Sequence, residues 1–154
     1  RALARDWPVS SSGRLPWPDA IPRGAGLISP TLLLPLASAA DLRAPGDSHV
    51  FHVHTDHDFF RISLRVSGRE PIEVDYRLDS TNGERQVREQ VEALVIRMQV
   101  TPLGRPEDGF ELLGLRPPLT LLLDPATRLP LALRGEAPRF GPGEVRLQAA
   151  RLSE

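Results

Sequence analysis

Apolar and polar residues alternate with a period of two along most of the chain after residue 47. In "FFRISLRVSG" at 59–68, the even-numbered positions up to Val66 are apolar and most of the odd-numbered positions are polar. This alternation is typical of antiparallel strands with one buried face. It recurs in "PIEVDYRL" and "ALVIRMQV", and the last third adds two or three further apolar segments. We therefore predict a mainly β fold of six or seven strands, either an antiparallel curved sheet or an open, β-barrel-like sheet.

Short polar segments separate the expected strands. "TDHD" at 55–58 predicts a tight hairpin turn, and Asn82 with Gly83 predicts the turn of a second, separate hairpin that starts near Ile72. "DPAT" predicts a type I turn, and Pro130 indicates an edge position or a bulge. "EVRLQAARL" predicts a single final strand, one face of which carries Val145, Leu147 and Ala149.

The N-terminal region differs from the rest. Its four prolines and three glycines exclude a long helix or a central strand. We predict an extended proline-rich arm at 1–26 and a single antiparallel β domain at 27–154. Anchors of the arm would be Trp7, Leu15, Trp17 and Ile21. "SPTLLLPLASAADL" predicts one short helix, capped by Ser29.

Composition narrows the class of protein. The chain has 154 residues, 40% of them hydrophobic and 25% charged, which fits one globular domain. Its net charge of −1 gives no support for a nucleic-acid partner. Cysteine is absent, which excludes disulfides and thiolate metal sites. The longest apolar run, "LLLPLA", is far short of the roughly 20 residues that span a bilayer, so we expect no membrane span.

All four histidines lie in "HVFHVHTDHD" at 49–58. A symmetric hairpin places His52 and His54 on the polar face and His49 on the apolar face, beside Phe51. Histidines at i and i+2 on one strand face can chelate zinc or copper. The candidate ligands are His52, His54, Asp56 and His57.

The alternative interpretation is a solvated polar face. Arg61, opposite His52, would repel a cation, and the only carboxylates available to orient the imidazoles are those in the turn. Arg61 and Arg65 share this face and could hold an anion instead. We favour the polar face and predict no cofactor.

No catalytic set emerges from the sequence. Every histidine is committed to one hairpin, so a serine nucleophile has no base elsewhere. The carboxylate pairs Glu73 with Asp75 and Glu107 with Asp108 fall on predicted polar faces or loops. We therefore expect a protein that is not an enzyme and has no catalytic residues.

The order of motifs resembles the bacterial DUF3108 family. "GLISPTLLLPLA", a "PGD" turn, "RISLRVSGREPIEV", "LTLLLDPATRLPLALRG" and "GEVRLQAARL" follow one another as in the C-terminal two-thirds of that family. The positions that carry the resemblance are Gly68, Glu70, Ile72, Asp124, Leu129, Pro130, Leu131 and Gly143. It covers roughly residues 26–152, and it departs from the family in the proline-rich arm and in the longer turn "DSTNGERQVREQ". It implies a periplasmic or cell-envelope protein of Gram-negative bacteria with an open β-barrel-like sheet and no assigned catalytic residues.

Three functions remain open. The leading hypothesis is a non-enzymatic envelope domain whose curved sheet holds a lipid or a hydrophobic partner segment. The first alternative is a structural subunit that docks a partner protein through its arm and edge strands, and the second is the histidine metal site. The chain begins at Arg1 without an initiator methionine, which we interpret as a processed product that has lost a signal peptide. The oligomeric state stays open.

Overall fold

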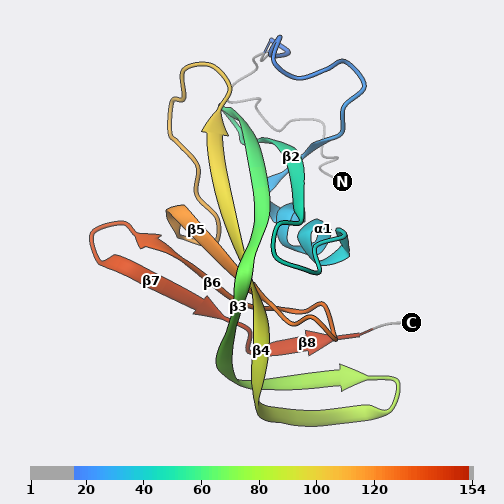
Figure 1. Cartoon of the computed structure of the whole chain (residues 1–154). Coiled ribbons are helices and arrows are strands. Elements are labelled where there is room, and N and C mark those ends of the chain that lie inside the picture. Colours follow the sequence, from blue (N-terminus) through green and yellow to red (C-terminus); the bar gives the residue numbers. More distant parts are fainter. Residues whose placement is uncertain (1–15, 153–154) are drawn as a thin grey trace, which may run out of the picture.

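The predicted fold class is confirmed: the described residues form one open, mainly antiparallel sheet with one short α-helix (Figure 1). The structure is a computed structural model and describes residues 16–152, so Trp7 and Leu15 lie outside it. The strands are β1 (Leu27–Ile28), β2 (Ser48–His54), β3 (Phe59–Ser80), β4 (Gly83–Pro102), β5 (Arg116–Leu123), β6 (Pro130–Ala137), β7 (Gly141–Arg146) and β8 (Ala149–Arg151). The helices are the 3-10 turn η2 (Pro30–Leu32) and α1 (Leu33–Ala39).

The strand order follows the sequence from β1 to β7, and β8 pairs with β3. The pairings are antiparallel except β1 with β2 and β3 with β8. Two very long strands, β3 and β4, run the length of the molecule, and their lower part bends away to form an arm (Figure 1). The prediction of a separate second hairpin near Ile72 is therefore wrong, because β3 continues without a turn from Phe59 to Ser80.

A β-bulge takes the place of the expected break. Val66 pairs with Ile96 and Gly68 with Val95, so Ser67 is one extra residue in β3. One extra residue exchanges the two faces for everything that follows it. The same even-numbered apolar pattern consequently faces one side of the sheet before the bulge and the other side after it.

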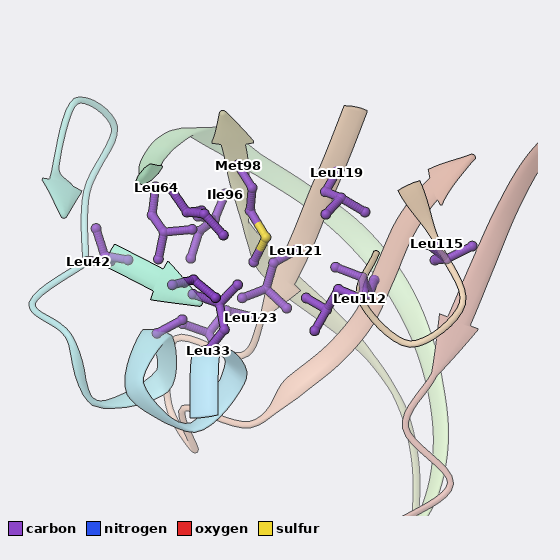
Figure 2. Close-up of a cluster of buried hydrophobic side chains, with 14 of the residues drawn as sticks. Leu33, Leu42, Leu64, Ile96, Met98, Leu112, Leu115, Leu119, Leu121 and Leu123 are labelled. Carbon is purple, nitrogen blue, oxygen red and sulfur yellow. The ribbon is translucent and has the colours of Figure 1, made fainter. Parts of the chain in front are cut away.

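The upper part of the sheet buries the first core. Its members from β3 are Phe60, Ile62, Leu64 and Val66, and β4 adds Leu94, Ile96 and Met98. Helix α1 covers this face with Leu33 and Ala37, and the loop before β5 adds Phe110, Leu112 and Leu115. Figure 2 shows Leu33 pointing from α1 into the sheet side chains around Leu123.

The bent lower part of β3 and β4 buries the second core, on the opposite face of the sheet. Its members are Ile72, Val74, Tyr76, Leu78, Val87, Ala93, Leu122, Leu131 and Ala132. Near position 94, neighbouring residues of β4 belong to different cores: Ala93 to the second and Leu94 to the first. Both are fully buried.

Two details of the N-terminal prediction change. Ser29 occupies the predicted cap position of η2 but makes no side-chain cap bond, because its hydroxyl lies 2.7 Å from that of Thr31. Of the expected anchors, Ile21 is buried, whereas Trp17 is 44% exposed and donates its indole N–H to the Ile21 carbonyl at 2.8 Å.

The C-terminal prediction of one final strand is wrong. The Leu147 N–H still donates to the Leu131 carbonyl, but the chain then crosses to β3, where the Arg77 N–H donates to the Gln148 carbonyl. Val145 and Ala149 are consequently exposed, and Leu147 packs against the second core. Pro130 begins β6 beside a register irregularity, as its bulge interpretation predicts.

Candidate functional site: the cleft between β4 and β5

The histidine hairpin has the register that the sequence predicts. Its pairs include His52 with Arg61, Val53 with Phe60 and His54 with Phe59. His49 lies on the other face, where its ring centroid is 4.5 Å from that of Phe51. The division of the histidines between two faces is therefore confirmed.

The candidate metal ligands do not converge. His54, Asp56 and His57 are exposed, and no three His, Asp or Glu side chains within residues 16–152 are placed to hold one ion. His57 lies instead beside Glu107, with its Nδ1 3.9 Å from Oε2. The metal alternative thus has no three-ligand set in the described part of the chain.

Asp58 is the residue of this turn that sequence reasoning missed. It is 4% exposed, and its two carboxylate oxygens accept the backbone N–H groups of Glu107 and Asp108 at 2.7 and 3.0 Å. Its own N–H donates to the Thr55 hydroxyl at 3.0 Å. One carboxylate therefore ties the hairpin turn to the loop after β4. Local sequence gives no signal for this contact, since the partners are about 50 residues away.

We expect the contribution of Asp58 to stability to disappear in acid. The N–H groups of Asp108 and Glu107 hold the pKa of this carboxyl below its ordinary value of 3.8. A depressed folded-state pKa stabilises the protein above the unfolded-state pKa, and this stabilisation is lost as pH falls through the folded-state value. Urea unfolding should show Asp58→Asn about 1–3 kcal/mol less stable than the wild type near neutral pH. The two proteins should converge toward about pH 2, because protonated Asp58 resembles the amide. A difference that is unchanged across this range contradicts the assignment.

β4 and β5 separate at one end of their paired segment, and a cleft opens between them there. Their pairing ends where Met98 faces Leu119. Continued in the same register, Gln99 would face Pro118 and Val100 would face Pro117, but proline has no N–H to donate to the ladder. Figure 1 shows the start of β5 diverging from β4 at this end. The resulting β4–β5 cleft has a volume of about 740 Å³.

The lining of the cleft combines an apolar wall with polar donors. The apolar residues are Met98, Val100, Pro117, Pro118 and Leu119. The polar residues are Ser48, Ser63, Arg65, Arg97, Gln99 and Thr120. All of these polar side chains can donate hydrogen bonds, and no carboxylate lines the cleft.

A cross-strand row places four of these six donors side by side. Ser48 faces Arg65, Arg65 faces Arg97, and Arg97 faces Thr120, so one row crosses β2, β3, β4 and β5. Of the two arginines that the sequence singles out for an anion, Arg65 lines the cleft. Arg61 faces His52 and Thr101 and lies outside the lining.

A second concavity, the lower groove, lies against the second core. It has a volume of about 610 Å³ and is lined by Ile72, Glu73, Val74, Asp75, Tyr76, Arg88, Glu89, Gln90, Leu131, Arg146, Leu147 and Gln148. Its cations already have partners. Arg88 lies 3.1 Å from the Asp75 carboxylate, and Arg146 pairs with Glu144 and donates to the Glu73 carbonyl at 2.9 Å. Burial, together with the charges of Asp124 and Glu89, raises the pKa of Tyr76. The groove therefore offers an anion no free arginine among its described lining residues.

No protein-family model, curated protein or solved structure matches the chain. The resemblance to the DUF3108 family stays a prediction. Within residues 16–152, no helix has the length and apolar character that crossing a membrane requires.

Proposed function

We propose that the protein is a non-enzymatic binding domain of the bacterial cell envelope and that the β4–β5 cleft holds a small lipid-like ligand. The observation that carries the proposal is the cleft itself, which opens where two prolines end the β4–β5 ladder. Its volume of about 740 Å³ is in the range of small-molecule sites.

The main apolar face of the sheet is already covered by other parts of the chain, so a lipid cannot bind there. Helix α1 and the loop before β5 cover this face, and Leu33, Leu112 and Leu115 fill the space above it. A lipid chain cannot occupy that volume. The apolar wall of Val100, Pro117 and Pro118 remains accessible, since Val100 is half-buried and both prolines are exposed.

A binding role rather than a catalytic one fits the lining. None of the residues that line the cleft is a histidine or a carboxylate, the side chains that serve most often as general bases. The envelope location is supported by the sequence resemblance to the DUF3108 family.

Blocking the cleft tests the proposal. Thr120 is half-buried and lines the cleft, so Thr120→Trp should fill it and abolish the binding of decanol and decanoate in calorimetric titration. Thr101→Trp is the matched control, because Thr101 is exposed on β4 outside the lining and should leave binding unchanged. Equal losses in both variants, or a wild type that binds neither of these compounds nor decyl phosphate, contradict the proposal.

An open strand edge favours a second function, that of a structural subunit. β3 pairs along one edge of β4, and β5 pairs along the other edge only over 94–98. That other edge therefore has no strand partner at 84–92 among the described residues. Such an edge can accept an extended segment of a partner protein. A partner purified with the protein from its host should then slow hydrogen exchange of the amides at 84–92. Protection confined to other segments contradicts strand addition at this edge.

A further inference from the structure

We infer that the ligand of the β4–β5 cleft carries an anionic head group, a carboxylate or a phosphate monoester, held between the guanidinium groups of Arg65 and Arg97. The inference rests on the proposed function, because it takes the cleft as the binding site. It adds the charge and the chemical class of the ligand.

Two like charges face each other in the lining of the cleft. Arg65 and Arg97 occupy directly opposite positions on neighbouring strands. Like charges in that arrangement destabilise a sheet. A bound anion would remove this repulsion, because it would sit between the two cations.

These two arginines also have no acidic partner among the described residues. No carboxylate of residues 16–152 forms an ion pair with Arg65 or Arg97. Arg134 faces Thr120 and so continues the same row, but it is paired. Its Nη1 lies 2.5 Å from Glu70 Oε1, and its Nε lies 2.7 Å from Glu144 Oε2. The arginine of this row that lies outside the cleft is thus paired with carboxylates, whereas the two inside the cleft have no such partner within residues 16–152.

The other polar groups of the cleft are suited to the same anion. The side chains of Ser48, Ser63 and Thr120, with hydroxyls, and of Gln99, with an amide, line the same cleft as the two arginines. Guanidinium forks match the geometry of carboxylate and phosphate oxygens, and the hydroxyls can donate to the remaining oxygens. The apolar wall lies in the same cleft, so a single ligand can place its head group on the arginines and its chain on the prolines.

The decisive experiment compares decanoate and decyl phosphate with uncharged decanol by calorimetric titration of the whole chain. The wild type should bind at least one of the two anions about tenfold more tightly than decanol, which corresponds to one charge-assisted contact. Arg65→Gln and Arg97→Gln should each weaken binding of that anion by about tenfold and leave decanol binding unchanged. Unchanged decanol binding also shows that each variant is folded.

Arg61→Gln is the matched control. It removes the same charge from the same strand outside the cleft, so anion binding should change less than about twofold. If decanol binds as tightly as both anions, or if Arg61→Gln weakens anion binding as much as Arg65→Gln, the inference is overturned while the proposed function stands. If none of the three compounds binds, both fail. Should Arg97→Gln unfold, Arg97→Lys provides the test, since it keeps the charge without the bidentate fork and should bind the anion with intermediate affinity.

Discussion

Gly135→Ala should lower the free energy of unfolding by about 2 kcal/mol, which for a chain of this size is a fall in Tm of roughly 4–8 °C. A Cβ at this position would lie 2.7 Å from Leu119 Cδ2, 2.9 Å from the Arg116 carbonyl oxygen and 3.0 Å from Leu115 Cβ. The leucine methyl group can move, but the backbone oxygen cannot move without shifting the start of β5.

The reason lies in the packing of β6 and β7 under the loop before β5. Gly135 faces Gly143 across these two strands, and Leu115, which is 4% exposed, packs over both glycines. Arg116 directly precedes Pro117 and Pro118, which form a wall of the β4–β5 cleft. Gly135→Ala should therefore weaken decanoate binding as well as stability.

Gly68→Ala is the control, because it makes the same change in a strand where a Cβ meets nothing within 4 Å and φ is not positive. It should be neutral or should stabilise by up to about 1 kcal/mol through the entropy of the unfolded chain. Thermal unfolding of both variants decides the matter. Equal Tm values for the two variants contradict the proposed packing.

Arg128→Ala should lower the free energy of unfolding by about 2–3 kcal/mol and should loosen helix α1. The guanidinium group of Arg128 donates to three carbonyl oxygens at the end of α1 and just beyond it: Ser38 at 3.0 Å, Ala40 at 2.9 Å and Leu42 at 2.8 Å. The last four carbonyls of a helix have no partner within the helix, and a cation there also interacts favourably with the helix dipole. One side chain from the β5–β6 turn thus fixes the helix that covers the first core.

Arg139→Ala is a close control for Arg128→Ala. Both arginines adopt positive φ, 62° for Arg128 and 71° for Arg139, but Arg139 is exposed at the β6–β7 turn. Backbone strain relieved or created by alanine is therefore similar in the two variants. Urea unfolding should show the larger loss for Arg128→Ala, and hydrogen exchange should accelerate across residues 33–42 in that variant only. Equal losses of stability, or exchange in α1 that does not change, would show that the three bonds do not hold the helix.

The sequence predicts the strands well where one face is apolar and the turn chemistry is local. The register of the β2–β3 hairpin follows from "TDHD" and from the alternation around Phe51 and Val53. The bulge at Ser67 could not be predicted, because apolar residues occupy even-numbered positions both before it, up to Val66, and after it, from Ile72. The pattern records that alternate residues are buried, but it does not record on which side of the sheet.

This limit explains what the sequence reveals of the candidate site. Arg65 stands out in its strand, but its partner Arg97 does not. Counting back from the turn, where Ser80 faces Gly83, without the bulge places Arg65 opposite Met98 instead. The cleft depends likewise on where Pro117 and Pro118 fall relative to β4, and this is fixed only by tertiary pairing. The final crossing to β3 was missed for a similar reason, since backbone bonds made by Arg77 leave no pattern in "EVRLQAARL".

The most direct test of the central claim, that the β4–β5 cleft is the ligand site, is a map of amide and arginine Nε chemical shifts during titration with decanoate. We expect the largest changes at residues 97–100 and 119–120 and at the side chains of Arg65 and Arg97. Changes centred on the histidine hairpin at 52–57 or on the lower groove at 72–76, or no changes at all, would contradict it.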